Sequence, residues 1–390
     1  MAQGPSDSSV KIYEKFDDMD IPAAILRGVF SFGFEKPSEI QKRGIKPIMD
    51  GNDVMAQAQS GTGKTGTFTI ASLSRVDAEL PVTQVLILVP TRELAQQIET
   101  VVRGISLHTK ITVHSATGGI PVRDDISALQ RGAHILIGTP GRVYDLMERN
   151  ALKRDSIKVL VLDEADQMLE GRFRDQMDCI LNMGFPDTTK VALFSATMPQ
   201  EVIDVAERLL KDPVRILLPP EKVTLEGIRQ YYVEIEQDAW KFDCLCDLWQ
   251  HMNIAQAIIY ANQRTKVEYL AKRLQENGFE VSYIHGDMDP KERRACINSF
   301  RQGTSRVLVS SDLLARGIDV QQVSLVINFE LPIQRENYIH RIGRSGRYGR
   351  KGNAINLLSL DDARSMKDIE EFYKITINNL PEDLGSMCLS

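Results

Sequence analysis

The sequence predicts an α/β protein of two tandem domains, each with a mostly parallel sheet flanked by helices. The chain has 390 residues, and at about 150 residues per domain this length favours two or three domains. Short apolar runs alternate with amphipathic stretches, which is typical of βαβ units and parallel sheets. Polar cassettes follow several of the runs, at the strand ends where open α/β sheets bind their ligands.

The strand predictions rest on runs of Val, Ile and Leu. In chain order the expected strands are 85–89, 135–137, 159–162, 191–194, 257–260, 307–309 and 325–328, and the stretches 54–58 and 214–218 are also strand-like. Pro219 and Pro220 then predict an exposed linker over residues 218–226. We therefore expect a flexible tail at 1–9, a first domain at 10–217 and a second at 227–390, each able to hold five to seven strands.

Composition narrows the class of protein. Hydrophobic residues make up 43% of the chain and charged residues 26%, which are the proportions of a folded globular protein. The apolar runs are far shorter than the roughly 18 residues that span a bilayer, so no membrane span is expected. The five cysteines lack paired CxxC spacing, which favours reduced thiols in the cytosol or nucleus. Cys244 and Cys246 are interpreted as packing residues.

The charge balance gives no overall footprint for nucleic acid. There are 47 basic and 53 acidic residues, for a net charge of -6, so a nucleic-acid site would have to be local. One candidate is a basic run without an intervening acid, formed by Arg341, Arg344, Arg347, Arg350 and Lys351.

A phosphate-binding loop is the strongest chemical signal. It follows the strand-like stretch 54–58, precedes a helix-compatible segment, and consists of Ser60, Gly61, Thr62, Gly63, Lys64 and Thr65. Glycines let backbone N–H groups approach phosphate, Lys64 would reach the β and γ phosphates, and the Thr65 hydroxyl would bind magnesium. The generic pattern has glycine where this chain has Ala58. A chance glycine-rich turn is the alternative, but strand, loop and Lys-Thr together favour phosphate.

Two acids directly after the strand 159–162 complete the expected nucleotide site. Asp163 would hold the metal, and Glu164 would accept a proton from the attacking water. Alone, this pair could simply be favourable acids at a helix N-terminus. Combined with the loop, it favours hydrolysis of a nucleotide.

Together these motifs resemble those of the DEAD-box RNA helicases. The resemblance covers nearly the whole chain, and Ala58 is the usual opening of the loop in that family. It rests on the segments 90–95 (PTRELA), 139–142 (TPGR), 163–166 (DEAD), 195–197 (SAT), 315–319 (ARGID) and 340–347 (HRIGRSGR). It implies two RecA-like domains that bind ATP and RNA across a cleft.

The resemblance also implies how adenine is recognised. Residues 33–41 are similar to the family's adenine-reading Q motif, in which Phe34 and Gln41 contact the nucleotide and an upstream aromatic, here Phe16, covers the base. A Gln amide can pair with adenine N6 and N7, a pattern that guanine does not offer. Without the surrounding motif, Phe16 would be interpreted as a core residue and Gln41 as a helix-surface residue.

Further roles are carried over from the family in the same way. Arg344 and Arg347 resemble its arginine fingers, His340 their partner near the attacking water, and Gly317 and Asp319 nucleotide contacts. Asp166, Ser195 and Thr197 would couple the domains. The implied RNA contacts are Pro90, Thr91, Arg92, Gly118, Gly119, Thr139, Gly141, Arg142, Gly286, Asp287, Arg293, Ser311, Arg316 and Gly317. Such residues bind a sugar-phosphate backbone, so recognition should be largely independent of sequence. Pro290 and Ser311 depart from the family's usual Gln and Thr.

Two functions remain open at this point. The first is an ATP-dependent RNA helicase that unwinds short duplexes, resembling the subfamily that acts in translation initiation. Its expected partners are a scaffold of the initiation factor 4G type and stimulating factors, and its compartment is the cytoplasm. The second is an ATP-gated RNA clamp of the exon-junction type, which would be nuclear. A DNA translocase is disfavoured by residues 33–41. The chain is expected to be a monomer.

Overall fold

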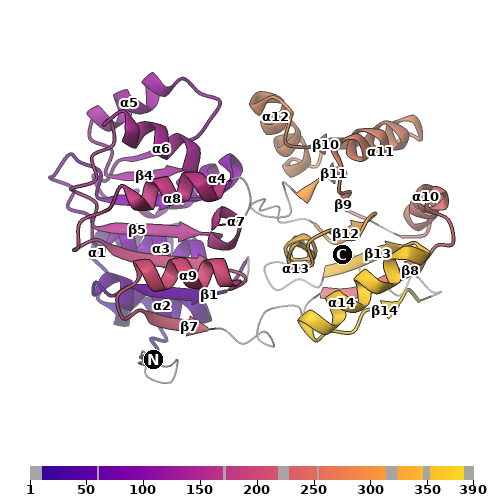
Figure 1. Ribbon diagram of the computed structural model, residues 1–390, viewed down its shortest axis with the longest axis horizontal. Helices are drawn as coiled ribbons and strands as arrows, with labels where there is room; N and C mark the ends of the chain where they lie inside the picture. Colours follow the sequence, from indigo (N-terminus) through magenta and orange to yellow (C-terminus); the bar gives the residue numbers. More distant parts are fainter. Residues whose placement is uncertain are drawn as a thin grey trace. The chain divides into compact units, whose positions relative to one another are not determined.

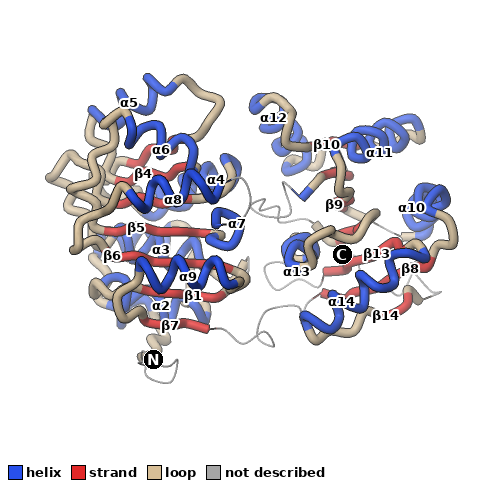
Figure 2. The backbone as a smooth tube through the Cα atoms, viewed as in Figure 1, coloured by secondary structure: helices blue, strands red, loops and turns tan. Residues whose placement is uncertain are grey.

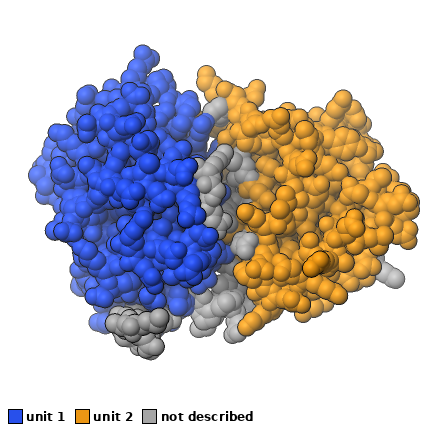
Figure 3. Space-filling view, in the orientation of Figure 1, with its two compact units in different colours: residues 1–219 blue, residues 220–390 orange. Residues whose placement is uncertain are grey.

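The computed structural model divides the chain into two compact units, residues 1–219 and 220–390 (Figure 3). It describes residues 11–58, 61–169, 173–217, 228–252, 254–312, 323–345 and 352–381. The predicted tail, 1–9, and linker, 218–226, lie outside these residues. None of the helices described is both long and apolar enough to cross a membrane.

The first unit is a parallel sheet with helices on both faces (Figure 1). The described strands lie in the order β3 (Val113–Ala116), β4 (Ile135–Gly138), β2 (Val85–Leu88), β5 (Val159–Asp163), β6 (Lys190–Ser195), β1 (Val54–Gln57) and β7 (Val214–Leu217). The helices are α1 (Ala23–Ser31), α2 (Glu39–Met49), α3 (Lys64–Leu73), α4 (Arg92–Ile105), α5 (Val122–Gln130), α6 (Pro140–Glu148), α7 (Ala165–Leu169), α8 (Arg174–Asn182) and α9 (Gln200–Leu209).

The second unit repeats this plan (Figure 2). Its described strands lie in the order β10 (Val281–Ile284), β11 (Val307–Ser310), β9 (Ala257–Tyr260), β12 (Leu325–Asn328), β13 (Gly352–Leu358), β8 (Ile228–Glu234) and β14 (Asn378–Asn379). Its helices are α10 (Lys241–His251), α11 (Arg264–Glu276), α12 (Pro290–Arg301), α13 (Glu336–Ile342) and α14 (Ala363–Tyr373). The prediction of two parallel α/β sheets is confirmed.

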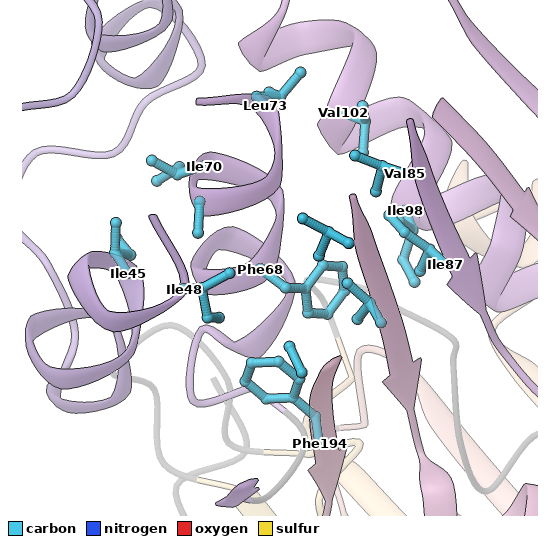
Figure 4. Packing of buried hydrophobic residues seen from close by; sticks show 14 of the residues in the cluster. Ile45, Ile48, Phe68, Ile70, Leu73, Val85, Ile87, Ile98, Val102 and Phe194 are labelled. Atoms are coloured by element: carbon cyan, nitrogen blue, oxygen red, sulfur yellow. The ribbon is translucent and has the colours of Figure 1, made fainter. Parts of the chain in front are cut away.

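Alternate residues of each buried strand face opposite helical layers. On β2, Val85 and Ile87 pack with α1 to α4, whereas Leu86 and Leu88 pack with α6 to α9. Figure 4 shows the first of these cores, where Phe68 of α3 meets Phe194 of β6 with ring centroids 5.4 Å apart. Burial on both faces explains why these strands are continuous apolar runs rather than alternating ones.

Two cysteines of the second unit are packing residues, as predicted. Cys244 and Cys246 lie against its core, and burial raises the pKa of Cys244 to about 11. A thiol with so high a pKa remains protonated and unreactive near neutral pH.

Candidate functional site

The loop between β1 and α3 has the backbone shape that its glycines predict. Gly61 and Gly63 adopt φ of 87° and 104°, which L side chains rarely adopt. Lys64 is the first residue of α3 and is 7% exposed. Helix N-terminal N–H groups at this point can bind an anion. Thr62 and Thr65 are half-buried in the same segment, and Ser60 lies outside the described residues.

Gln41 connects α2 to this loop. Its Oε1 accepts a hydrogen bond from the backbone N–H of Ser38 at 2.8 Å, and its Nε2 donates to the carbonyl of Gly63 at 3.3 Å. The packing is close enough that a Cβ at Gly66 would lie 2.5 Å from Gln41 Nε2 and 3.1 Å from the ring of Phe34. The structure therefore places Gln41 and Phe34, which are predicted to contact adenine, beside the predicted phosphate-binding loop.

The predicted aromatic residues differ in how accessible they are. Phe16 is 1% exposed within the core, with its ring centroid 6.2 Å from that of Phe30 and 6.4 Å from that of Phe34. Phe34 is half-buried and packs at the edge of that core. In this structure Phe16 is a packing residue, so contact with a base requires Phe16 to become exposed or Phe34 to act in its place.

Asp163 and Glu164 are buried where β5 ends. Asp163 Oδ1 lies 3.7 Å from Lys64 Nζ and accepts a hydrogen bond from the Glu164 N–H at 3.0 Å. Burial raises the pKa of Asp163, while the charge of Lys64 acts in the opposite direction. Glu164 is 3% exposed and has a φ of 54°, an uncommon and strained conformation for a non-glycine residue. Strain of this kind is typical of functional sites.

The residues expected to couple the domains meet one another within the first unit. Asp166 Oδ2 accepts hydrogen bonds from the Thr197 hydroxyl at 2.7 Å and from the Thr197 N–H at 3.2 Å. Ser195 Oγ accepts one from the Asp166 N–H at 3.1 Å. These bonds join the ends of β5 and β6, and a role between the units stays a prediction.

Most of the RNA contacts predicted in the first unit gather at the ends of β2, β3 and β4. Thr91 Oγ1 accepts a hydrogen bond from the Leu94 N–H at 3.2 Å and so caps α4. Arg92 lies beside Gly118, since a Cβ added there would be 3.0 Å from Nη2 of Arg92. Gly119 is exposed with a φ of 89°. Three further predicted RNA contacts lie at the starts of α4 and α6, namely Pro90, Thr139 and Gly141.

Arg142 differs from its neighbours because its guanidinium has internal partners. Nη1 pairs with the carboxylate of Asp125, and Nη2 donates to the carbonyl of Ile120 at 2.7 Å. Asp125 was not predicted as a site residue. It does fall on the apolar face of α5, one turn from Val122 and Leu129, and this position could have identified it as buried.

In the second unit, His340 lies on α13 and Arg344 lies two residues after the end of that helix. The two side chains are 3% and 2% exposed, and Arg344 Nε donates to the carbonyl of His340 at 3.1 Å. Arg316, Gly317, Asp319 and Arg347 lie outside the described residues, so their expected roles stay predictions.

The interpretation of the basic run as an RNA patch is wrong for Arg341. Its side chain is 0% exposed, and Nε donates to Asp312 Oδ1 at 2.5 Å. Further donations go to Asn262 Oδ1 at 2.7 Å and the Glu330 carbonyl at 2.7 Å. Asp312, which is distant in the sequence, neutralises the guanidinium. Arg341 therefore connects the segments that follow β9, β11 and β12 and is not available to RNA.

Those predicted RNA residues of the second unit that the structure describes lie at the ends of β10 and β11 and on α12. Gly286 and Asp287 follow β10, and Asp287 pairs with Arg264 of α11. Arg293 on α12 is 7% exposed, and Ser311 directly follows β11. Pro290 is the first residue of α12, after a cap by Asp289. Proline is favourable at this helix position, which gives the departure a structural reason.

Comparison with known proteins adds independent information. Residues 38–205 match the DEAD/DEAH box helicase family, and residues 240–349 match the helicase conserved C-terminal domain. The chain is 52% identical to eukaryotic initiation factor 4A of Caenorhabditis elegans over 377 residues, covering 97% of this chain and 94% of that protein. It is 51% identical to the ATP-dependent RNA helicase eIF4A of Schizosaccharomyces pombe, covering 97% and 96%.

A solved structure shares the fold. S. cerevisiae Dbp5 bound to RNA and ADP BeF3 matches with a TM-score of 0.87 and 35% identity, covering 95% of this chain and 96% of that one.

Proposed function

The chain belongs to the DEAD-box family of RNA helicases, and on this premise we propose that it unwinds short RNA duplexes with energy from ATP during translation initiation. Its two units are tandem RecA-like domains. It is an ATP-dependent RNA helicase of the initiation factor 4A type.

The main support for the proposal is that the predicted nucleotide-binding residues meet at the carboxyl ends of the strands of the first sheet. The loop at Gly61 to Thr65, the buried Asp163 and Glu164, and Gln41 all meet there, with Lys64 Nζ 3.7 Å from Asp163. A nucleotide is the ligand that uses all of them, since the loop suits phosphates and the amide suits adenine. The glycine and hydroxyl loops after β2, β3 and β4 lie at the same edge and suit a sugar-phosphate backbone.

The proposed hydrolysis divides the work among these side chains. Lys64 neutralises charge on the β and γ phosphates, Glu164 accepts a proton from water, and His340, Arg344 and Arg347 stabilise charge on the transferred group. Thr65 and Asp163 provide a hydroxyl and a carboxylate, the hard oxygen donors that magnesium takes together with substrate phosphates. The bound ion would supply charge neutralisation there.

The names of the relatives support a role in initiation rather than in an exon-junction clamp. On this proposal the protein works in the cytoplasm, on a translation-initiation scaffold of the 4G type with stimulating factors. It binds RNA with little regard for sequence.

The test is ATP and GTP hydrolysis by the full chain, with and without single-stranded RNA, beside multiple-turnover unwinding of a short duplex. We expect RNA to stimulate ATP hydrolysis, GTP to be a poor substrate, and duplexes to be separated catalytically. Equal kcat/KM for the two nucleotides would reject the role of Gln41. A stable RNA complex without turnover would favour the clamp.

A further inference from the structure

Asp125 is a buried carboxylate to which neither the sequence motifs nor the proposed mechanism gives a role. It lies on α5 with its side chain 0% exposed, between His114 of β3 and Arg142 of α6. His114 Nε2 is 2.7 Å from its Oδ1, and Arg142 Nη1 pairs with its Oδ2. Both carboxylate oxygens are therefore engaged by side chains from other elements.

Through Arg142 the same cluster reaches the loop after β3. Arg142 Nη2 donates to the carbonyl of Ile120 at 2.7 Å, and Ile120 directly follows the predicted RNA contacts Gly118 and Gly119. Arg142 itself lies in the first turn of α6, next to Gly141. The carboxylate thus fixes the guanidinium that ties one RNA-binding loop to the start of another.

The charges within the cluster are largely balanced. The Arg142 side chain is only 11% exposed, and its charge is compensated by a carboxylate held away from water. A guanidinium in this state has little net charge to offer a phosphate. Removing the carboxylate would leave it buried and unbalanced, and the side chain would have to move.

We propose that Asp125 is a positioning residue for RNA binding, which acts by holding Arg142 as a brace between the Gly118–Gly119 loop and the N-terminus of α6. Arg142 then serves RNA binding by shaping these loops and not as a phosphate contact. This inference rests on the proposed function, because it assumes that the braced loops bind RNA.

The first experiment compares Asp125→Asn with Asp124→Asn in the full chain. Asp124 is the matched control, since it is the adjacent residue of α5, with its side chain 59% exposed. We expect Asp125→Asn to raise the RNA concentration for half-maximal ATPase by about tenfold, because the loops must then be ordered on binding. The kcat at saturating RNA and the KM for ATP should stay near wild type, and Asp124→Asn should leave all three unchanged. A general structural defect would change kcat and the ATP KM as well.

The second experiment distinguishes a brace from a phosphate contact. Affinity for a labelled single-stranded oligonucleotide, with a non-hydrolysable ATP analogue, is measured against salt for the wild type and Arg142→Gln. A lost phosphate contact lowers the slope of log K against log salt by about 0.7. We expect weaker binding with an unchanged slope, and no additional loss when Asp125→Asn is combined with Arg142→Gln. A slope lowered by about 0.7, or wild-type RNA binding by Asp125→Asn, would overturn the inference.

A second variant tests the inference if Asp125→Asn does not fold. His114→Ala removes the other side chain that contacts the Asp125 carboxylate, and the His114 side chain is 23% exposed. It should weaken RNA binding in the same direction, and wild-type affinity would reject the inference. If the wild-type chain itself fails to bind RNA, the proposed function fails, whereas wild-type binding with an unaffected Asp125→Asn removes only the brace.

Discussion

At the scale of single residues, the candidate site keeps charged groups where water is scarce. Asp163, Glu164 and Lys64 are each less than 10% exposed. Burial raises the pKa of Asp163, so its ionised form is costly in the structure on its own. A bound cation would reverse this cost, since a positive charge favours the carboxylate. The side chains are thus arranged for a charged ligand more than for stability.

Glu164→Gln is expected to separate binding from hydrolysis. Lys64, Thr65 and Asp163 remain, so ATP and RNA should still bind, but the carboxylate that we propose as the proton acceptor is lost. A positioned general base typically contributes about 10² to 10⁴ in rate, so kcat should fall by at least about 100-fold and RNA should remain trapped with ATP. ATPase assays and the lifetime of the RNA complex measure this. The control is Glu79→Gln, whose side chain is 77% exposed. Wild-type hydrolysis by Glu164→Gln would exclude Glu164 as the base.

Residue chemistry could be predicted where a motif fixes it, and not where it depends on contacts distant in the sequence. Lys64 and Gln41 belong to local patterns, and the structure brings both to one loop. Arg341 appeared to belong to a free basic run because its partner, Asp312, is separated from it in the sequence. The same is true of Asp125 with Arg142. Asp125 occupies the apolar face of α5, a signal that indicates burial but not the partner, whereas the neighbours of Arg341 along its helix give no such signal.

At the scale of elements, most of the strands that could be predicted are buried on both faces, and the exception is the edge strand β7. Their uninterrupted apolar runs end within one or two residues of the observed strands. The missed strands are β3, β8, β10, β13 and β14. Three of these, β3, β10 and β14, lie at sheet edges, where one neighbour is absent and polar residues are tolerated. β13 is fully buried yet contains Asn353 and Asn356. Asn356 forms hydrogen bonds with Asn328 and Tyr338, so polar partners replace the apolar signal.

An ion-pair clamp joins two elements of the second unit. Lys241, at the start of α10, is 2% exposed, and its Nζ lies 3.1 Å from both Asp238 and Asp362. Burial alone would raise the pKa of Asp362, but Ser359 and Lys241 lower it below 3.8. For Asp238 the two lysines, Lys241 and Lys266, outweigh burial in the same way.

The clamp should stabilise the second unit at neutral pH and fail in acid. Because the folded-state pKa of both carboxyls is lowered, their contribution is complete above pH 3.8 and is lost as pH falls through the folded values. Lys241→Met should cost about 2 kcal/mol at pH 7, the size of a lost hydrogen bond to a charged group, and the difference from wild type should shrink below that window. Urea unfolding followed by tryptophan fluorescence reports on this unit alone, since both tryptophans, Trp240 and Trp249, belong to it.

The control for the clamp is Lys272→Met, whose side chain is 79% exposed and 4.0 Å from Glu276. It should leave stability unchanged at either pH. A Lys241→Met effect of the same size in acid and at pH 7 would show that packing, and not charge, is responsible.

At the scale of the whole molecule, the residues assigned to hydrolysis are divided between two units that each have their own core. Lys64, Asp163 and Glu164 belong to the first unit, and His340 and Arg344 to the second. The predicted RNA contacts are divided in the same way, from Thr91 in one unit to Arg293 in the other. We expect such a division to let RNA act on catalysis by favouring the state in which both halves contact the same ligands.

The final prediction is that neither unit alone supports RNA-stimulated hydrolysis. Residues 1–217 retain the loop, the two acids and the core of the first unit, so this fragment should fold and bind ATP weakly. It lacks the arginines, which contribute on the order of 10³ to 10⁵ in related phosphoryl transfers, so its kcat should be very low and insensitive to RNA. Full-length Arg344→Ala should bind RNA but lose most of the stimulation. The measurement is RNA-stimulated ATPase for the fragment, the full chain and the variant, side by side. Full stimulation of the fragment or of Arg344→Ala would refute catalysis by both units, while the family assignment would stand.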